Sequence, residues 1–473
     1  MMKRAIATLA GLALSGCMVG PDYASPAARQ PAQTPFVGAN DPAFVPAPPP
    51  AEWWKLFNAP ILDRLVADAV AANTDLRVAA ANLRQARAVL RESRNARLPT
   101  TNLSASGNYG QQSGAGFGQS GPLYRGETYD AGLDVGYQID LFGRIARAIE
   151  ASRADVDAVA ATYDLTRITV VAETIRAYAE ACSTGNQLNV ARESLRVQEE
   201  TFDLTRRLFE GGRGTALDTS RASALLEQTR ADIPTLEATR RAALFRLAVL
   251  TGRPPAEFPA EVAACTTPPT TTSPIPVGEG TTLLARRPDV RAAERRLAAA
   301  TARIGVATAD LYPSISLGGS IGSTATSIGD LFSNSGFRFG LGPLISWTFP
   351  NTGLARARIA QAEAATEAAL AQFDGAWLGA LQETETALTR YTAEGSRVAT
   401  LLRARDASAE AARIARLRYQ AGAETFQIVL DAERSLAASE ALLAQSRAQF
   451  SDLTITLFLA LGGGWEAQAP PAN

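Results

Sequence analysis

The sequence contains no histidine among its 473 residues and only two lysines, Lys3 and Lys55. The absence of histidine excludes Ser-His-Asp and Cys-His catalysis and removes the commonest protein ligand of transition metals. Neither lysine lies in a GK[ST] phosphate loop or in an S-x-x-K nucleophile motif. No spacing of carboxylates specifies a metal, and a formal net charge of −1 provides no basic field for nucleic acid. We therefore expect a protein that is not an enzyme, with no metal, no cofactor and no nucleic-acid partner.

The sequence also lacks a run of eighteen apolar residues, so no transmembrane helix is expected. At the N-terminus, Lys3 and Arg4 precede a short apolar run at 5–14 and the letters LSGC, which end at Cys17. This order is typical of a bacterial lipoprotein signal peptide. We expect residues 1–16 to be removed and Cys17 to carry a covalent lipid that anchors the chain. An ordinary secretory signal with an incidental cysteine is the alternative.

Cysteine is otherwise scarce, because only Cys182 and Cys265 remain beyond Cys17. An exported chain meets an oxidising compartment, which favours a disulfide between the two. Two separate buried thiols are the alternative that the sequence leaves open.

The chain repeats one plan twice, since Pro99 corresponds to Pro313 and Gly212 corresponds to Gly422 in two similar halves. Proline is concentrated before the first half and between the halves, where an extended linker and a connector are expected. The sequence predicts six segments: a signal peptide 1–16, a Pro-rich anchor linker 17–52, a first repeat 53–252, a Pro/Thr-rich connector 253–276, a second repeat 277–464 and a tail 465–473.

Each repeat contains one very long helix. Residues 144–210 hold a single glycine and no proline before Gly211 and Gly212, and residues 354–420 match them in length. Apolar residues recur every seven positions, which is a coiled-coil spacing. A helix over 144–210 would be about 100 Å long at 1.5 Å per residue, wider than a compact core. Shorter helices are expected before the strands and after each turn, with a kink at Pro234.

Four segments alternate between apolar residues and mostly small or polar ones, which predicts strands with one apolar face. They are 101–109, 128–142, 314–322 and 337–349. Their lengths fit strands that span a bilayer, with the polar face, including Asp130, Asp134 and Asp140, directed to water. The loops 111–127 and 323–336 would lie outside the cell. Half of a soluble β-sandwich is the alternative.

Four strands cannot cross a membrane alone, because open edges leave backbone groups unpaired in hydrocarbon. Closed barrels begin at about eight strands. Two, three or four copies of the chain would therefore contribute to one shared barrel, and the sequence pattern leaves the number open.

Several longer segments carry a resemblance to a known family. They are CMVGPDY, WWKLFNAPILDRLV, LLARRPDVRAAERRLAAATARIGVATADLYPSISL, RYQAGAETFQIVLDAERSL and LALGGGW. The chain resembles the TolC-like outer-membrane factors of tripartite efflux systems, in their lipoprotein, NodT-type branch. The resemblance implies a mainly α fold with a transmembrane β part. In a homotrimer, long coiled-coil helices would form an α-barrel tunnel, and four strands per protomer would build a shared 12-stranded β-barrel.

The resemblance also indicates where the tunnel would close. In ETFQIVLDAERSL, Asp431 and Arg434 are three residues apart on one helix face, with Gln427 one turn away. The resemblance places these residues at the periplasmic gate, where three copies would form charged rings. The family often has leucine where this chain has Gln427. Asp218 and Arg221 are a second candidate pair in the first repeat, and a solvated helix face is the alternative for all of them.

The turns 209–215 and 419–425 are the expected docking tips for a periplasmic adaptor protein. The tip residues are Gly211, Gly212, Gly214, Ala421 and Gly422.

We therefore expect a channel-tunnel in the Gram-negative outer membrane, lipid-anchored and inserted through its β-barrel, with its helices in the periplasm. It would act as a passive conduit that exports small molecules such as drugs and toxic compounds, together with an adaptor and an inner-membrane transporter. A lipid-anchored coiled-coil spacer without a pore is the main alternative, although a spacer needs no alternating strands. A periplasmic adaptor would not need two repeated copies, and a hydrolase lacks its usual residues.

Overall fold

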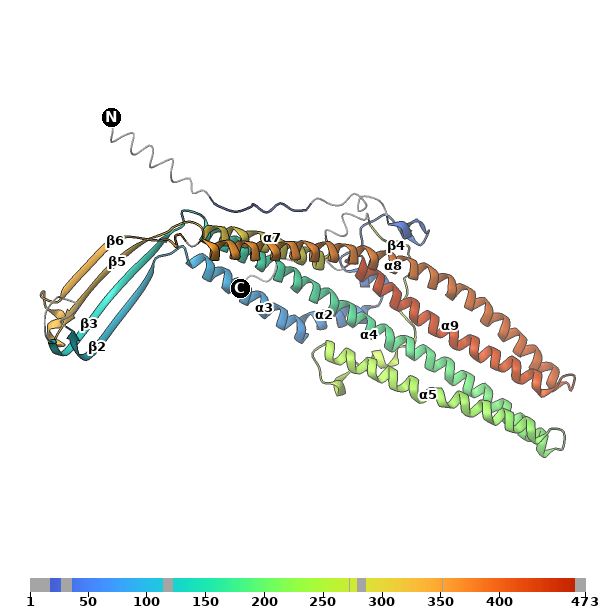
Figure 1. Cartoon of the computed structure of the whole chain (residues 1–473). Coiled ribbons are helices and arrows are strands. Elements are labelled where there is room, and N and C mark those ends of the chain that lie inside the picture. Colours follow the sequence, from blue (N-terminus) through green and yellow to red (C-terminus); the bar gives the residue numbers. More distant parts are fainter. Residues whose placement is uncertain are drawn as a thin grey trace. The chain divides into compact units, whose positions relative to one another are not determined.

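A computed structural model describes most of the chain. The described residues are 18–26, 36–113, 122–271, 273–278, 286–350 and 352–463. The expected signal peptide 1–16, the lipid attachment residue Cys17 and the tail 465–473 lie outside them. The elements in chain order are η2 (Val37–Asn40), β1 (Phe44–Val45), η3 (Trp53–Phe57), α2 (Pro60–Ala72), α3 (Thr74–Asn95), β2 (Thr100–Ser113), β3 (Pro122–Ile139), α4 (Arg144–Glu210), α5 (Ala216–Leu250), η5 (Pro255–Glu257), η6 (Val262–Ala264), β4 (Ile275–Pro276), α7 (Pro288–Ala309), β5 (Ser314–Ala325), η7 (Gly329–Phe332), β6 (Phe337–Ser346), α8 (Gly353–Gln420) and α9 (Phe426–Ala460) (Figure 1).

The chain forms two compact units, and each unit draws segments from both halves of the sequence. Unit 1 consists of Met1–Pro26, Leu83–Val159 and Ala292–Phe373. Unit 2 consists of Ala27–Asn82, Ala160–Arg291 and Asp374–Asn473.

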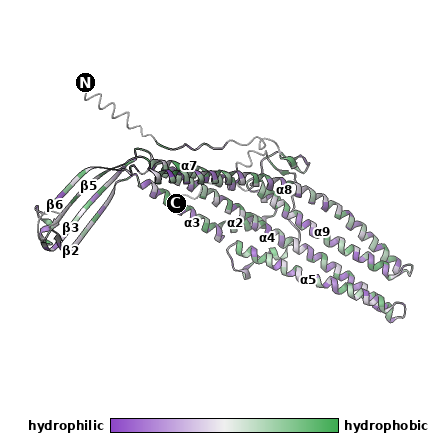
Figure 2. Ribbon diagram, viewed as in Figure 1, coloured by the Kyte–Doolittle hydropathy of each residue, from purple (hydrophilic) through white to green (hydrophobic). Residues whose placement is uncertain are grey.

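Unit 1 contains a four-stranded antiparallel sheet in the order β2-β3-β5-β6. The predicted alternation is confirmed, because the register aligns like residues across all four strands. One row consists of Leu103, Leu133, Ile321 and Phe339. The adjacent row, on the other face, consists of Asn102, Asp134, Ser320 and Gly340. Figure 2 shows hydrophobic and hydrophilic residues interspersed along these strands.

The apolar face of the sheet is open within one chain. Leu103 is 81% exposed and Phe339 is 79% exposed. No helix of the described segments is both long enough and apolar enough to cross a membrane.

The loop expected at 111–127 is shorter than predicted, because β2 continues to Ser113 and β3 begins at Pro122. The backbone ladder extends past the alternating region, with Gly110 opposite Gly126. Backbone hydrogen bonds do not depend on side-chain alternation, so the alternating pattern alone underestimates the length of these strands.

Asp140 was expected on the polar face of the strand 128–142, but β3 ends at Ile139, just before it. Its carboxylate accepts hydrogen bonds from the N–H groups of Ile145 (3.0 Å) and Ala146 (2.7 Å). Asp140 thus pairs two of the orphan donors at the start of α4.

The predicted long helices are confirmed as α4, with 67 residues, and α8, with 68 residues. Each ends just before a glycine turn. α5 continues through Pro234, and α5 and α9 each have 35 residues. The break between α2 and α3 occurs at Asn73, whose side-chain oxygen accepts from the N–H groups of Asp75 (2.9 Å) and Leu76 (3.3 Å).

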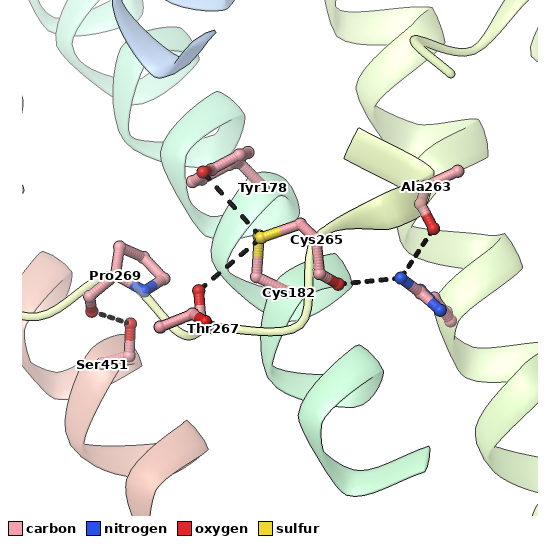
Figure 3. Close-up of a disulfide and its surroundings, with 8 residues drawn as sticks. Tyr178, Cys182, Ala263, Cys265, Thr267, Pro269 and Ser451 are labelled. Atoms are coloured by element: carbon pink, nitrogen blue, oxygen red, sulfur yellow. Dashed lines mark hydrogen bonds between the residues drawn. A yellow bond between two sulfur atoms is a disulfide. The ribbon is translucent and has the colours of Figure 1, made fainter. Parts of the chain in front are cut away.

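Unit 2 has the larger apolar core, in which Trp53 stacks on Phe458 with ring centroids 4.8 Å apart. The connector between the two halves is fastened to this unit. Its Cys265 forms a disulfide with Cys182 of α4, so the pairing that the sequence left open is present in the structure (Figure 3). Further along the connector, the carbonyl of Pro269 accepts a hydrogen bond from Ser451 of α9 (3.0 Å; Figure 3).

Candidate functional site at the tips of the helical hairpins

The turn between α4 and α5 is the first tip, and it lies in unit 2. Gly212 has φ +69°, a left-handed conformation that favours glycine. Its N–H donates to the carbonyl of Phe209 (3.0 Å), and the N–H of Arg213 donates to that of Leu208 (2.8 Å). These two bonds pair the last carbonyls of the helix in a Schellman motif. A Cβ at Gly214 would lie 3.0 Å from the backbone nitrogen of Phe209, so the close approach of the chain favours glycine there too.

The turn between α8 and α9, the second tip, repeats this geometry. Gly422 has φ +73°, its N–H donates to the carbonyl of Tyr419 (2.9 Å), and the N–H of Ala423 donates to that of Arg418 (2.9 Å). Arg418 also forms an ion pair with Glu424 (3.3 Å), which occupies the position of the first tip's third glycine.

Both turns present an open surface within one chain. A Cβ at Gly212 or Gly422 would find no neighbour within 4 Å in the described part of the chain. Gly211 and Ala421 occupy equivalent exposed positions just before these glycines. The docking role of the tips stays a prediction.

Three of the five gate candidates form one hydrogen-bonded chain between two helices. The Arg221 guanidinium on α5 donates to the side-chain oxygen of Gln427 on α9 (2.7 Å). The side-chain nitrogen of Gln427 lies 3.1 Å from both carboxylate oxygens of Asp431. The structure therefore links the two hairpins through Gln427, a contact between residues 206 positions apart.

The other two candidates do not join this chain. Asp218 lies in the first turn of α5, which Thr215 caps: the Thr215 hydroxyl accepts from the N–H of Asp218 (3.2 Å) and donates to its carboxylate (2.7 Å). Arg434 is exposed and has no ion-pair partner among the described residues of one protomer. Its charge remains available for contacts that a single chain does not provide.

An apolar cluster beneath these polar residues holds the four helices together near the tips, and the sequence analysis missed it. Its buried members come from α5, α8 and α9, and Phe202 of α4 and Tyr419 of α8 pack against them. Burial and the charge of Asp218 raise the pKa of Tyr419. The buried residues are Ala222, Leu225, Ala415, Phe426, Val429 and Leu430.

Glu433 is a second residue that the sequence analysis missed. Its side chain on α9 is 2% exposed and forms an ion pair with Arg416 of α8 (3.1 Å). Gln198 of α4 donates to the other carboxylate oxygen (3.4 Å). Burial raises the pKa of Glu433 above its ordinary value, against the opposing influence of Arg416 and Gln198. The signal in the sequence is the seven-residue spacing of Glu433 and Glu440, which puts two carboxylates on one face of α9.

Comparison with known proteins identifies the family. A family model described as outer membrane efflux protein matches residues 65–253 and 281–463. The chain belongs to this family. Nodulation protein T of Rhizobium leguminosarum bv. trifolii is 31% identical to this chain over 460 residues. The aligned residues cover 97% of this chain and 97% of that protein.

A second relative is the probable efflux pump outer membrane protein TtgC of Pseudomonas putida. It is 31% identical over 485 residues, which cover 100% of this chain and 98% of TtgC. The solved structure of the outer-membrane channel OprN has a TM-score of 0.90 and 37% identity, covering 95% of this chain and all of that one (100%).

These findings confirm the predicted resemblance, the outer-membrane location and the role as an outer-membrane efflux component. They also confirm the predicted mainly helical architecture with few strands, which this chain shares with the solved structure of OprN. The relatives named here are described as nodulation, efflux or channel proteins and not as enzymes.

Proposed function

We propose that this outer membrane efflux protein is the conduit of a tripartite pump and that three copies close around one pore. The open sheet of unit 1 carries the proposal. Within one chain, β2 and β6 are its edge strands, and its apolar face is exposed. Unpaired strand edges are unfavourable in hydrocarbon, and closure with further copies removes them.

Three copies would supply twelve strands, a number above the lower limit for a closed barrel. The apolar row of Leu103, Leu133, Ile321 and Phe339 would then contact lipid, and the polar row would line the pore. The α4 and α8 helices would form the walls of a periplasmic tunnel. The number three follows the family resemblance rather than the strand pattern.

The hairpin tips would form the periplasmic end of the tunnel. Copies of Asp431 and Arg434 around a three-fold axis would make charged rings, which restrict the passage of ions and solutes. The exposed turns at Gly212 and Gly422 would receive the hairpins of a periplasmic adaptor, which in turn would connect the conduit to an inner-membrane transporter.

The cargo class follows from the names of relatives. Among them are a toluene efflux protein, an antibiotic efflux protein and a pyoverdine export protein, all from Pseudomonas putida. We infer small organic molecules as cargo. No cofactor is required for such a passive conduit, and the lipid on Cys17 would serve as an anchor.

Electron microscopy of the mature protein extracted in detergent tests the proposal directly. Side views should show a three-fold tube with a membrane band and a helical tunnel of about 100 Å, the length that 67 helical residues give. Compact monomers or thin rods would contradict it and favour the lipid-anchored spacer without a pore.

A further inference from the structure

Among the described residues of unit 1, Arg147 near the start of α4 is the most deeply buried charged residue, with a side chain that is 1% exposed. Its guanidinium binds the first described residues of the chain. It donates to the carbonyls of Val19 (3.1 Å) and Gly20 (3.2 Å). It also donates to the carboxylates of Asp22 (2.7 Å) and Glu150 (2.8 Å). A buried guanidinium is tolerated only where its donors are paired, so α4 and residues 19–22 depend on each other here.

The backbone of residues 18–26, which we name the N-terminal clasp, lies very close to two helices of unit 1. Gly20 has φ +89°, and a Cβ there would lie 2.4 Å from the Cα of Gly305 on α7. A Cβ at Gly143 would lie 2.5 Å from the Cγ of Met18. Gly20 therefore has two reasons to be glycine, its left-handed φ and its approach to the backbone of Gly305, and a Cβ on Gly305 would in turn lie 2.8 Å from the Cγ of Arg147.

The far end of the clasp is fastened to α7, beside which the start of the described chain runs in Figure 1. The Tyr23 hydroxyl donates to Glu294 (2.9 Å), and the Ser25 hydroxyl donates to the same oxygen (3.0 Å). Burial and the hydrogen bond to Glu294 raise the pKa of Tyr23 to about 12. The Arg295 guanidinium lies 5.7 Å from the centre of the Tyr23 ring.

Val19, in the first part of the clasp, contacts the region where aromatic residues flank the ends of the strands. The N–H of Val19 donates to the carbonyl of Phe142 (3.3 Å), and the Phe142 ring stacks on Tyr312 at 4.6 Å. Trp347 and Phe349 stack on each other at 4.7 Å, and both are at least half exposed. Exposed aromatic rings at strand ends are typical of the level where a barrel meets the lipid headgroups.

We infer that the N-terminal clasp fixes the lipid-anchored end of the chain at the aromatic level of the sheet, with Arg147 as the residue that holds it. The partner is the lipid surface, and this inference rests on the proposed lipid anchor at Cys17. Consecutive Cα atoms are about 3.8 Å apart, so the position of Met18 confines the attachment point. Residues 27–52, the remainder of the proline-rich linker, come after the clasp in the sequence. They therefore add no length between the lipid anchor and unit 1.

Spin labelling of the full-length protein in outer membranes tests the clasp. The label is attached to an Ala24→Cys variant, because Ala24 is exposed within the clasp. Cys17 is acylated in the proposal, and Cys182 and Cys265 are bonded to each other, so the new thiol is the one that reacts. Incorporation of a fatty-acid analogue is measured on the same samples.

Two variants should release the clasp by different routes. Arg147→Met removes the donors but keeps most of the volume, and Gly20→Ala keeps Arg147 but forces Gly20 away from Gly305. Arg147→Met removes three hydrogen bonds from a charged donor to the clasp, which should shift the balance between docked and free clasp by more than about 100-fold. Arg144→Met is the matched control, since Arg144 lies on the same helix, is half exposed and pairs with Asp310 instead.

The expected result is an immobile label in the wild-type and Arg144→Met backgrounds and a mobile label in the other two, with acylation retained in all four. A label that stays immobile in both Arg147→Met and Gly20→Ala would overturn the role of Arg147. A mobile label in an acylated wild-type protein would overturn the clasp alone. An immobile label without fatty-acid incorporation would overturn the lipid anchor and its link to the clasp, while leaving the conduit proposal intact.

Discussion

The two hairpin tips share one backbone design but differ in how their side chains secure it. The first tip has a capped helix, since Thr215 and Asp218 exchange hydrogen bonds at the start of α5. At the second tip, the capping residue Thr425 makes no side-chain cap bond. The α9 helix instead carries the buried Glu433 and the exposed Arg434. The comparison predicts that the hairpin of the second repeat costs less free energy to move than the hairpin of the first.

The largest effect is expected from weakening the apolar cluster that both tips share. Phe426→Ala deletes a buried ring from the start of α9 and should destabilise the packing of the tips by about 3–5 kcal/mol. Hydrogen exchange of the α5 and α9 amides near the tips should then accelerate strongly. Ile428→Ala, at a half-exposed position on the same helix, is the control and should leave exchange unchanged. Equal exchange in both variants would show that the cluster does not hold the tips.

The connector offers a second test, because a disulfide bonds it covalently to the first repeat, whereas its contacts with the second repeat, such as the hydrogen bond from Ser451 to Pro269, are non-covalent. Replacing both Cys182 and Cys265 by serine should lower the stability of unit 2 by about 2–4 kcal/mol, since the disulfide closes a long loop. Thermal unfolding with and without reductant measures the loss. Reductant should lower the melting temperature of the wild-type protein and leave that of the double variant unchanged. Ser451→Ala, which removes only the bond to Pro269, should cost about 1 kcal/mol.

Glu433 should make the second hairpin sensitive to pH. Folding raises its pKa, so the folded chain binds this proton more tightly than the unfolded chain does. Stability from this group is therefore full below its ordinary value of 4.5 and is lost as the pH rises through the raised value. Glu433→Gln should slow exchange in α9 relative to the wild type at pH 8 but not at pH 4.

The matched control for this test is Glu227→Gln on α5, where the carboxylate is exposed. It should change exchange at neither pH. If Glu433→Gln instead accelerated exchange at pH 8, the attraction of Arg416 would outweigh the desolvation of the carboxylate, and the second hairpin would not be the weaker one.

Removing the caps one at a time compares the tips most directly. Thr215→Ala should cost about 1 kcal/mol in local stability at the start of α5, because it removes a side-chain cap. Thr425→Ala should change the start of α9 little, since Thr425 makes no cap bond. Amide exchange in the first turns of α5 and α9 distinguishes the two. Similar effects in both variants would mean that the tips are secured alike.

The sequence predicted the parts of the molecule that repeat a period or end at a glycine. The alternation in 128–142 led to the strand that places Leu133 between Leu103 and Ile321, and Gly212 and Gly422 marked the ends of the long helices. Contacts between distant elements carry no such period. Gln427 joins Arg221 because two hairpins pack together, and Arg147 holds Gly20 because the N-terminal clasp packs against the start of α4. The extended N-terminal composition suggested a linker throughout, but residues 18–26 are docked.

The smallest effect is expected at the surface bridge between the hairpins. Arg221→Ala removes the donor to Gln427 at an exposed site, where such a bond contributes about 0.2–1 kcal/mol. If the bridge restrains the second hairpin, the single-channel conductance of the trimer in planar bilayers should rise by no more than about fivefold, in line with that energy. Arg434→Ala, which breaks no bond within one described chain, should raise conductance only if Arg434 contacts a neighbouring copy. A rise in Arg434→Ala without one in Arg221→Ala would place the restraint between protomers rather than between the two hairpins of one chain.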